Sequence, residues 1–233
     1  MVPTAPTAWE AQRMPRTPVR ISFSALLRVR DDDRYVLFHS PTRPGVCGPP
    51  GGVVKYLPPA AGLLERLGFD EELTPPHVEV ARTDLRGVLP ARSVRGFLAW
   101  FATGAYREHA EDCLRRELAE EAGEVGIGPL AENPHDLRFS HVRTVVEGPA
   151  PVPGKPYRQL RRFEVHDLVT GDGAGLRVAR ALARAGRAAD QPDVVCASRS
   201  DIRHGRLGRL LIAPQSAFLM GGTRLAPDLP PVR

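Results

Sequence analysis

The chain has 233 residues, of which 42% are hydrophobic and 25% charged, and it carries a formal charge of +5 at pH 7. This composition is typical of a folded globular protein and argues against collagen, a coiled coil and a wholly disordered chain. The length corresponds to one large domain or one domain with additions. No stretch approaches the roughly 18 apolar residues that a membrane-spanning helix needs, so no membrane partner is expected.

The basic residues are almost all arginine, since only Lys55 and Lys155 are lysine among 32 Lys and Arg. Clustered arginines would favour a nucleic-acid partner, but here they are scattered along the chain. Abundant Arg, Ala, Gly and Pro with scarce Lys is also what a GC-rich coding sequence produces. We therefore do not expect nucleic-acid binding, although a positive net charge would help to attract a phosphorylated small molecule.

Three cysteines, Cys47, Cys113 and Cys196, stand far apart and lack the paired spacing of a zinc site or a disulfide framework. Cysteines used in this way are typical of a reducing compartment. The sequence therefore predicts a cytoplasmic protein.

The two ends of the chain are rich in proline. Residues 1–17 predict a flexible leader and residues 223–233 a flexible tail, which leaves 18–222 as the folded domain. At its start, the apolar run 19–29, the polar turn Asp31-Asp32-Asp33 and the run 35–38 predict a β-hairpin.

The next part of the chain is less regular. Residues 63–67 predict one short helix between two proline pairs, and residues 78–88 predict a strand. The apolar run 96–101 fits either a strand or a short buried helix, and its periodicity does not decide between them.

The clearest helix covers residues 107–122. It contains no glycine or proline, and four apolar residues spaced by four lie along one face: Ala110, Leu114, Leu118 and Ala122. Gly123 is expected to end it.

Residues 137–147 and 161–169 predict two strands, 175–189 a second helix, and 194–198 a short strand. Residues 214–220 predict a terminal helix or strand. Strands and helices in this order predict an α+β or α/β fold with a mixed β-sheet.

The helix carries an acidic cluster. Glu117, Glu120 and Glu121 stand at i, i+3 and i+4, so their carboxylates share one face, where like charges repel. A divalent cation would make this arrangement favourable, because Mg²⁺ prefers hard oxygen ligands and keeps waters that substrate phosphates replace. The alternative is a solvated acidic face that Arg115 and Arg116 balance.

The order of residue types distinguishes the two. The segment follows a fixed pattern: a Glu, seven residues, Arg-Glu, an aliphatic residue, any residue, Glu-Glu, any residue and Gly. The residues at the specified positions are Glu108, Arg116, Glu117, Leu118, Glu120, Glu121 and Gly123. This pattern resembles the C-terminal two-thirds of the Nudix box, the signature of the Nudix hydrolases. The box opens with a glycine six residues before its first Glu, and here that position is Ala102.

The missing opening resembles the segment 47–54, Cys-Gly-Pro-Pro-Gly-Gly-Val-Val, in which glycines permit a sharp turn. If Gly52 is the opening glycine, an insertion of about residues 53–106 separates it from the helix. Gly51 and Gly52 should then lie against the N-terminal end of the helix in the folded protein.

This interrupted layout is similar to the SMODS-associated NUDIX domain, a bacterial branch found near nucleotide-second-messenger defence systems. The similarity covers about residues 19–221 and includes Asp84-Leu85-Arg86, the aromatic run 97–101 and Arg107-Glu108. It implies a Nudix-type α/β/α sandwich with a mixed β-sheet and an insertion inside the Nudix box.

The resemblance implies a hydrolase that cleaves a pyrophosphate bond in a nucleoside diphosphate derivative, using Mg²⁺ or Mn²⁺. By position, Glu117, Glu120 and Glu121 would be metal ligands, with Glu108 as a supporting ligand, and Arg116 would orient the acids through a salt bridge. Which carboxylate acts as general base is left open.

One position departs from the family pattern, since Glu124 follows Gly123 where an aliphatic residue is preferred. All expected metal ligands are present, which favours an active hydrolase. The alternative is a catalytically weak nucleotide-sensing or partner-binding module of a defence system.

The expected partner is a nucleotide-type small molecule, and a homodimer is allowed. Candidate substrate-binding residues are Gly51, Gly52 and Arg158, the last in a basic segment that can equally be a solvated loop. Four aromatic residues fit either base stacking or the core: Phe97, Trp100, Phe101 and Tyr106.

Overall fold

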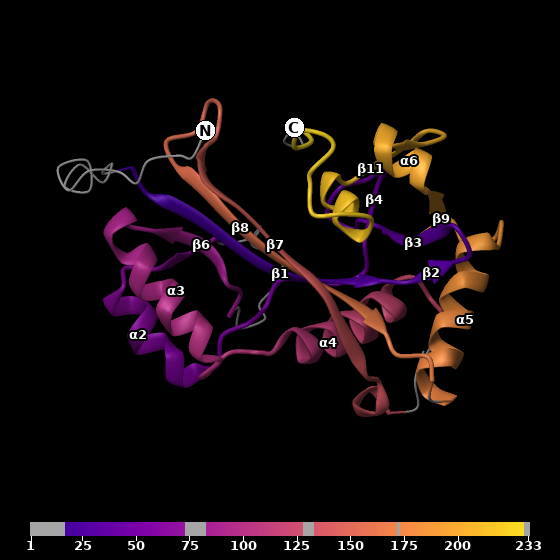
Figure 1. Cartoon of the computed structure of the whole chain (residues 1–233), viewed down its shortest axis with the longest axis horizontal. Helices are drawn as coiled ribbons and strands as arrows, with labels where there is room; N and C mark the ends of the chain where they lie inside the picture. Colours follow the sequence, from indigo (N-terminus) through magenta and orange to yellow (C-terminus); the bar gives the residue numbers. More distant parts are fainter. Residues whose placement is uncertain (1–16, 73–82, 128–132, 172, 231–233) are drawn as a thin grey trace, which may run out of the picture. The chain divides into compact units, whose positions relative to one another are not determined.

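The computed structural model describes residues 17–72, 83–127, 133–171 and 173–230 (Figure 1). It contains helices and mixed β-sheets, which confirms the predicted α+β class. All but the last residue of the predicted leader, and part of the predicted strand 78–88, lie outside the described residues. None of the helices in the described ranges is long and apolar enough to cross a membrane.

The chain divides into two compact units. Unit 1 takes in the chain up to Phe23 together with Val54–Glu108 and Val146–Arg161, and unit 2 takes in Ser24–Val53, His109–Val145 and the chain from Arg162 onward. Three strands contribute residues to both units: β1 (Val19–Arg28), β7 (Phe139–Pro151) and β8 (Arg158–Leu168).

Unit 1 is built on the first half of β1. Strand β6 (Arg86–Leu89) pairs with it in antiparallel register, Val19 opposite Leu89, and β5 (Asp70–Glu71) pairs with β6. Two helices follow 3-10 turns. The turn η1 (Pro58–Ala60) leads into α2 (Ala61–Arg66), and η2 (Ala91–Ser93) leads into α3 (Val94–Thr103).

The core of unit 1 decides the form of the run 96–101, which is a helix. Phe97 and Phe101 stand one helical turn apart on α3, and both pack edge-on against Phe23 of β1, with ring centroids 5.4 and 4.6 Å away. Aromatic pairs prefer this geometry, and it is available because helical spacing places both rings on one side. Gly104, with φ of +74°, ends the helix.

Unit 2 contains a six-stranded sheet in the order β10-β11-β4-β3-β2, with β9 also paired to β3. The β11–β4 pair is parallel and the others are antiparallel, so the sheet is mixed. The strand bounds are Arg30–Asp31 for β2, Arg34–His39 for β3, Val46–Gly48 for β4, Val194–Ser198 for β9, Arg206–Leu207 for β10 and Leu210–Ile212 for β11.

Helix α5 (Gly173–Arg187) packs along β9 and β3, as Figure 1 shows, and α6 (Arg199–His204) follows β9. The remaining 3-10 turns are η3 (Pro134–Asp136) and η4 (Pro214–Leu219). The helix predicted at 175–189 and the strand at 194–198 are therefore confirmed, and the segment 214–220 is a 3-10 helix.

The predicted hairpin is only partly correct. The turn forms, and β2 pairs with β3 through Arg30 opposite Tyr35, but β1 itself pairs with β6. One face of β1, from Val19 to Leu27, is buried at every position, and the strand lies between β6 and β8 in its sheet. The strands predicted at 137–147 and 161–169 are the longer β7 and β8.

Helix α4 (Ala110–Glu124) begins and ends later than predicted. Gly123 lies inside it, and the stop is a Schellman motif in which Gly126 has φ of +68°. The N–H of Gly126 donates to the carbonyl of Gly123 (3.2 Å), and that of Ile127 donates to the carbonyl of Ala122 (3.1 Å). The helix therefore ends where a left-handed residue can satisfy its last carbonyls.

This correction predicts opposite effects for two alanine substitutions. Gly123→Ala should stabilise the protein by about 0.5–1 kcal/mol, because a helical glycine is replaced and the new Cβ meets no atom within 4 Å. Gly126→Ala should destabilise it by about 1–2 kcal/mol, because its backbone is left-handed. Urea denaturation of both variants measures the difference, and a destabilised Gly123→Ala variant would show that α4 ends at that residue.

Candidate active site

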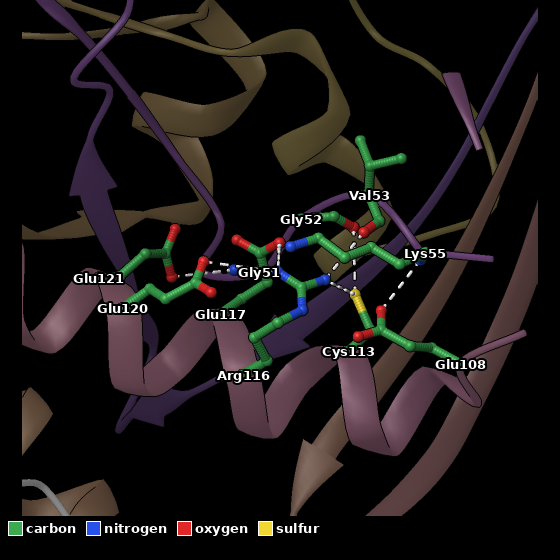
Figure 2. A network of polar contacts seen from close by, with 10 residues as sticks. All are labelled: Gly51, Gly52, Val53, Lys55, Glu108, Cys113, Arg116, Glu117, Glu120 and Glu121. Atoms are coloured by element: carbon green, nitrogen blue, oxygen red, sulfur yellow. Dashed lines mark hydrogen bonds and ion pairs between the residues drawn. The ribbon is translucent and has the colours of Figure 1, made fainter. Parts of the chain in front are cut away.

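The Gly51-Gly52 turn lies against the acidic face of α4, and all these residues belong to unit 2 (Figure 2). The N–H of Gly51 donates to Oε2 of Glu121 (3.1 Å). A Cβ on Gly52 would lie 2.1 Å from the carboxylate carbon of Glu117, so only glycine leaves room for that carboxylate in its present position. The thiol of Cys113 reaches the carbonyl of Gly52 at 3.6 Å.

The three helix residues that face the turn, Cys113, Glu117 and Glu121, stand four residues apart on α4. The contact therefore includes the N-terminal turn, where the sequence predicted it, and extends along the helix to its last turn. Two backbone hydrogen bonds hold the turn to β1: Ala25 N–H to the carbonyl of Gly52 (2.9 Å) and Leu27 N–H to that of Pro50 (2.8 Å). Residues far apart in sequence thus form one continuous site.

Arg116 links the carboxylates to the backbone next to the turn. Its Nη1 contacts Oε1 of Glu117 (2.6 Å) and, at 3.4 Å, Oε2 of Glu120. Its Nη2 donates to the carbonyl of Val53 (3.0 Å), as Figure 2 shows. The guanidinium fork can hold a carboxylate and a carbonyl at once, which an ammonium group cannot do with fixed geometry.

Glu121 is electrostatically unusual. Removal from water raises the pKa of its carboxyl well above the ordinary glutamate value, and the neighbouring Glu117, Glu124 and Glu120 raise that pKa further. The hydrogen bond from Gly51 acts in the opposite direction and does not offset them. Glu120, by contrast, has a half-exposed side chain.

These residues fit a hard divalent cation in donor type and in charge. Three carboxylates supply oxygen ligands, and a cation would offset the repulsion that raises the pKa of Glu121. In the arrangement described, however, Glu117 is engaged by Arg116. Within the described ranges no three His, Cys, Asp or Glu side chains converge as a metal site.

The family model described as the SMODS-associated NUDIX domain matches residues 18–220. The chain belongs to this family. No curated protein and no solved structure matches it. Membership in the Nudix superfamily confirms the resemblance based on the acidic helix and on the glycine turn far upstream of it.

In this SMODS-associated NUDIX domain, Glu108 belongs to unit 1. Its carboxylate accepts a hydrogen bond from the N–H of Lys55 (3.0 Å), and its own N–H donates to the carbonyl of Lys55 (2.8 Å). Tyr56 and Arg107 form an antiparallel bridge beside them. The two ends of the segment 54–108 are therefore paired with each other, and Glu108 remains a predicted metal ligand.

Other candidate residues of the domain also lie in unit 1. Arg158, at the start of β8, donates from Nη2 to the carbonyl of Pro149 (2.7 Å), and its role with substrate stays a prediction. Three of the four aromatic residues are buried and belong to the core, so they do not stack on a base. They are Phe97, Trp100 and Phe101. Tyr106 alone of the four aromatics is exposed.

The sequence interpretation missed two groups of the site, the thiol of Cys113 and the carbonyl of Val53. Cys113 precedes Glu117 by four residues on the same helix, so its position facing the turn could have been found from helical spacing. The Val53 carbonyl carried no sequence signal, because any residue type supplies one.

The raised pKa of Glu121 predicts a pH dependence of metal-free stability. The folded protein holds this proton above about pH 4.5, where the unfolded chain releases it, so stability falls as pH rises from there. Glu121→Gln keeps an oxygen for the Gly51 N–H but carries no charge. It should raise Tm at pH 7 in the presence of a chelator, by about 2–4 °C per kcal/mol recovered.

Thermal denaturation of both proteins from pH 4 to 8 measures this effect. The wild type should lose stability relative to Glu121→Gln as the pH rises above about 4.5. An equal pH dependence in the two proteins would mean that Glu121 is ionised without cost.

Proposed function

We propose that this protein is a divalent-metal-dependent hydrolase that cleaves a pyrophosphate bond in a nucleoside diphosphate derivative. The observation that carries the proposal is the packing of the Gly51-Gly52 turn against Glu117 and Glu121 of α4. This packing joins the two separated parts of the Nudix box. Three free and buried cysteines support action in a reducing compartment, for which we propose the cytoplasm.

Each residue has a part in the proposed reaction. Glu117, Glu120 and Glu121 would hold Mg²⁺ or Mn²⁺, with Glu108 in support. The bound metal would neutralise phosphate charge and lower the pKa of a coordinated water. Arg116 positions Glu117 by an ion pair, and the Gly51 N–H positions Glu121. One carboxylate of this set, left free of the metal, would take the proton of the attacking water.

A second candidate function is nucleotide sensing or partner binding with little turnover, in a nucleotide-signalling defence system. It is favoured by the ion pair that occupies Glu117 and by the absence of three converging ligands within the described ranges. In this case the fold would bind a nucleotide-type ligand, and the carboxylates would contribute charge and shape rather than catalysis.

Turnover distinguishes the two functions. With Mg²⁺ or Mn²⁺, the wild type should release product from at least one member of a panel of nucleoside diphosphate derivatives. Glu120→Gln and Glu121→Gln should each lower kcat by about 10²-fold or more, because each removes a carboxylate of the proposed ligand set. Glu111→Gln is the matched control, since Glu111 lies on the same helix and pairs with Arg115.

The hydrolase proposal would be contradicted by the absence of metal-dependent turnover across the panel. Nucleotide binding without turnover would support the sensing function. If Glu120→Gln and Glu121→Gln both lose turnover while Glu111→Gln retains it, the sensing function is excluded.

Gly52→Ala tests the site without removing a carboxylate. The added methyl group would collide with the Glu117 carboxylate, which can swing away because it ends a flexible side chain. We expect little loss of stability and a fall in kcat of about 10-fold or more, as for a displaced group near the reacting atoms. Gly123→Ala, whose Cβ meets nothing, is the control and should keep its activity.

A further inference from the structure

Tyr106 is exposed in a backbone conformation that tyrosine rarely adopts. Tyr106 is 57% exposed, and its φ of +57° lies in the left-handed region. For a non-glycine residue this region is unfavourable, and it persists only where the surrounding structure holds it. The folded protein thus presents one aromatic ring to solvent at an energetic cost.

The neighbouring contacts in unit 1 fix this position. The guanidinium of Arg107 lies 3.9 Å from the centroid of the Phe101 ring and donates to the carbonyls of Phe101 (2.9 Å) and Glu108 (2.8 Å). The N–H of Leu57 donates to the carbonyl of Tyr106 (2.8 Å). The backbone that carries Tyr106 is therefore held on both sides, which lowers the entropy cost of binding a ligand there.

Two other side chains come from the paired segment. Leu57 is 44% exposed and lies across the backbone hydrogen bond from Tyr106. Lys55 is two residues away, its N–H held by the Glu108 carboxylate. In the parts of the chain that the structure describes, the Lys55 ammonium has no ion pair. This short paired segment thus carries a ring of the kind that stacks on a base and a cation of the kind that binds a phosphate.

We propose that Tyr106 and Leu57 form a stacking platform for the nucleobase and that Lys55 binds a phosphate of the same ligand. This inference rests on the proposed function in one respect, that the ligand is a nucleotide. All three residues belong to unit 1, where the Leu57 N–H joins its segment to the carbonyl of Tyr106. A patch of two exposed apolar residues and one lysine is also too small for a stable protein interface.

The test compares ADP with inorganic pyrophosphate, which shares its phosphates but has no base. Calorimetry with Mg²⁺ should give Tyr106→Asn an ADP affinity about 5- to 150-fold weaker than wild type, with pyrophosphate affinity unchanged. Tyr106→Phe should retain ADP binding, because the ring remains. Lys55→Met should weaken both ligands, and Leu98→Ala, which truncates another exposed side chain of unit 1, should weaken neither.

Folding does not obscure this test. Asparagine tolerates a left-handed backbone better than tyrosine does, so Tyr106→Asn should denature at a temperature no lower than wild type. The inference is overturned if Tyr106→Asn binds ADP as wild type does. It is also overturned if the variant loses ADP and pyrophosphate equally, or if wild type binds no ADP.

The two proposals fail separately. If no panel member is hydrolysed while ADP binding still depends on Tyr106, the hydrolase proposal fails and the stacking platform stands. If a nucleotide is hydrolysed and Tyr106→Asn leaves KM and ADP affinity unchanged, the platform fails and the hydrolase stands.

Discussion

The close approach of the Gly51-Gly52 turn to the acidic face of α4 is the constraint on which the candidate site depends. Gly52 leaves space for the Glu117 carboxylate, and Gly51 supplies an N–H to Glu121. Backbone hydrogen bonds to β1 fix the position of this turn. A side chain at either glycine would clash: at Gly51 with the Ala25 carbonyl, and at Gly52 with the carboxylate itself. The electrostatic consequence is a carboxyl group, that of Glu121, which is disfavoured in its charged form.

The same constraint explains how a Nudix box can be interrupted. The box requires its turn and its helix to touch, and it does not require them to be adjacent in sequence. The segment between them has its two ends paired through Tyr56 and Arg107 and through Lys55 and Glu108. A chain that leaves and returns at neighbouring points can be long without disturbing what it interrupts, because loop-closure cost grows only slowly with length.

The sequence predicted the parts of this structure that local patterns determine. The acidic helix, the glycine turn and their association follow from residue types at fixed spacing, and these led to the correct family. Local patterns failed where tertiary structure decides. The aromatic run 96–101 is apolar at nearly every position, so its helical form follows from packing against Phe23. Gly123 looked like a helix stop because glycine is common there, but Gly126 has the required left-handed backbone. The raised pKa of Glu121 depends on desolvation, which no spacing reveals.

The arginine content, an ambiguous feature of the composition, has a structural use in the described residues. Several guanidinium groups donate to main-chain carbonyls, and their planar forks can at the same time hold a carboxylate or lie over a ring. These pairs are Arg28 with Leu219, Arg107 with Phe101, Arg115 with Leu137, Arg116 with Val53 and Arg143 with Phe218. A lysine ammonium is a point charge on a flexible stem and would fix such contacts poorly. A point charge is nonetheless enough for the phosphate contact proposed for Lys55, since phosphate accepts hydrogen bonds from lysine as well as from arginine.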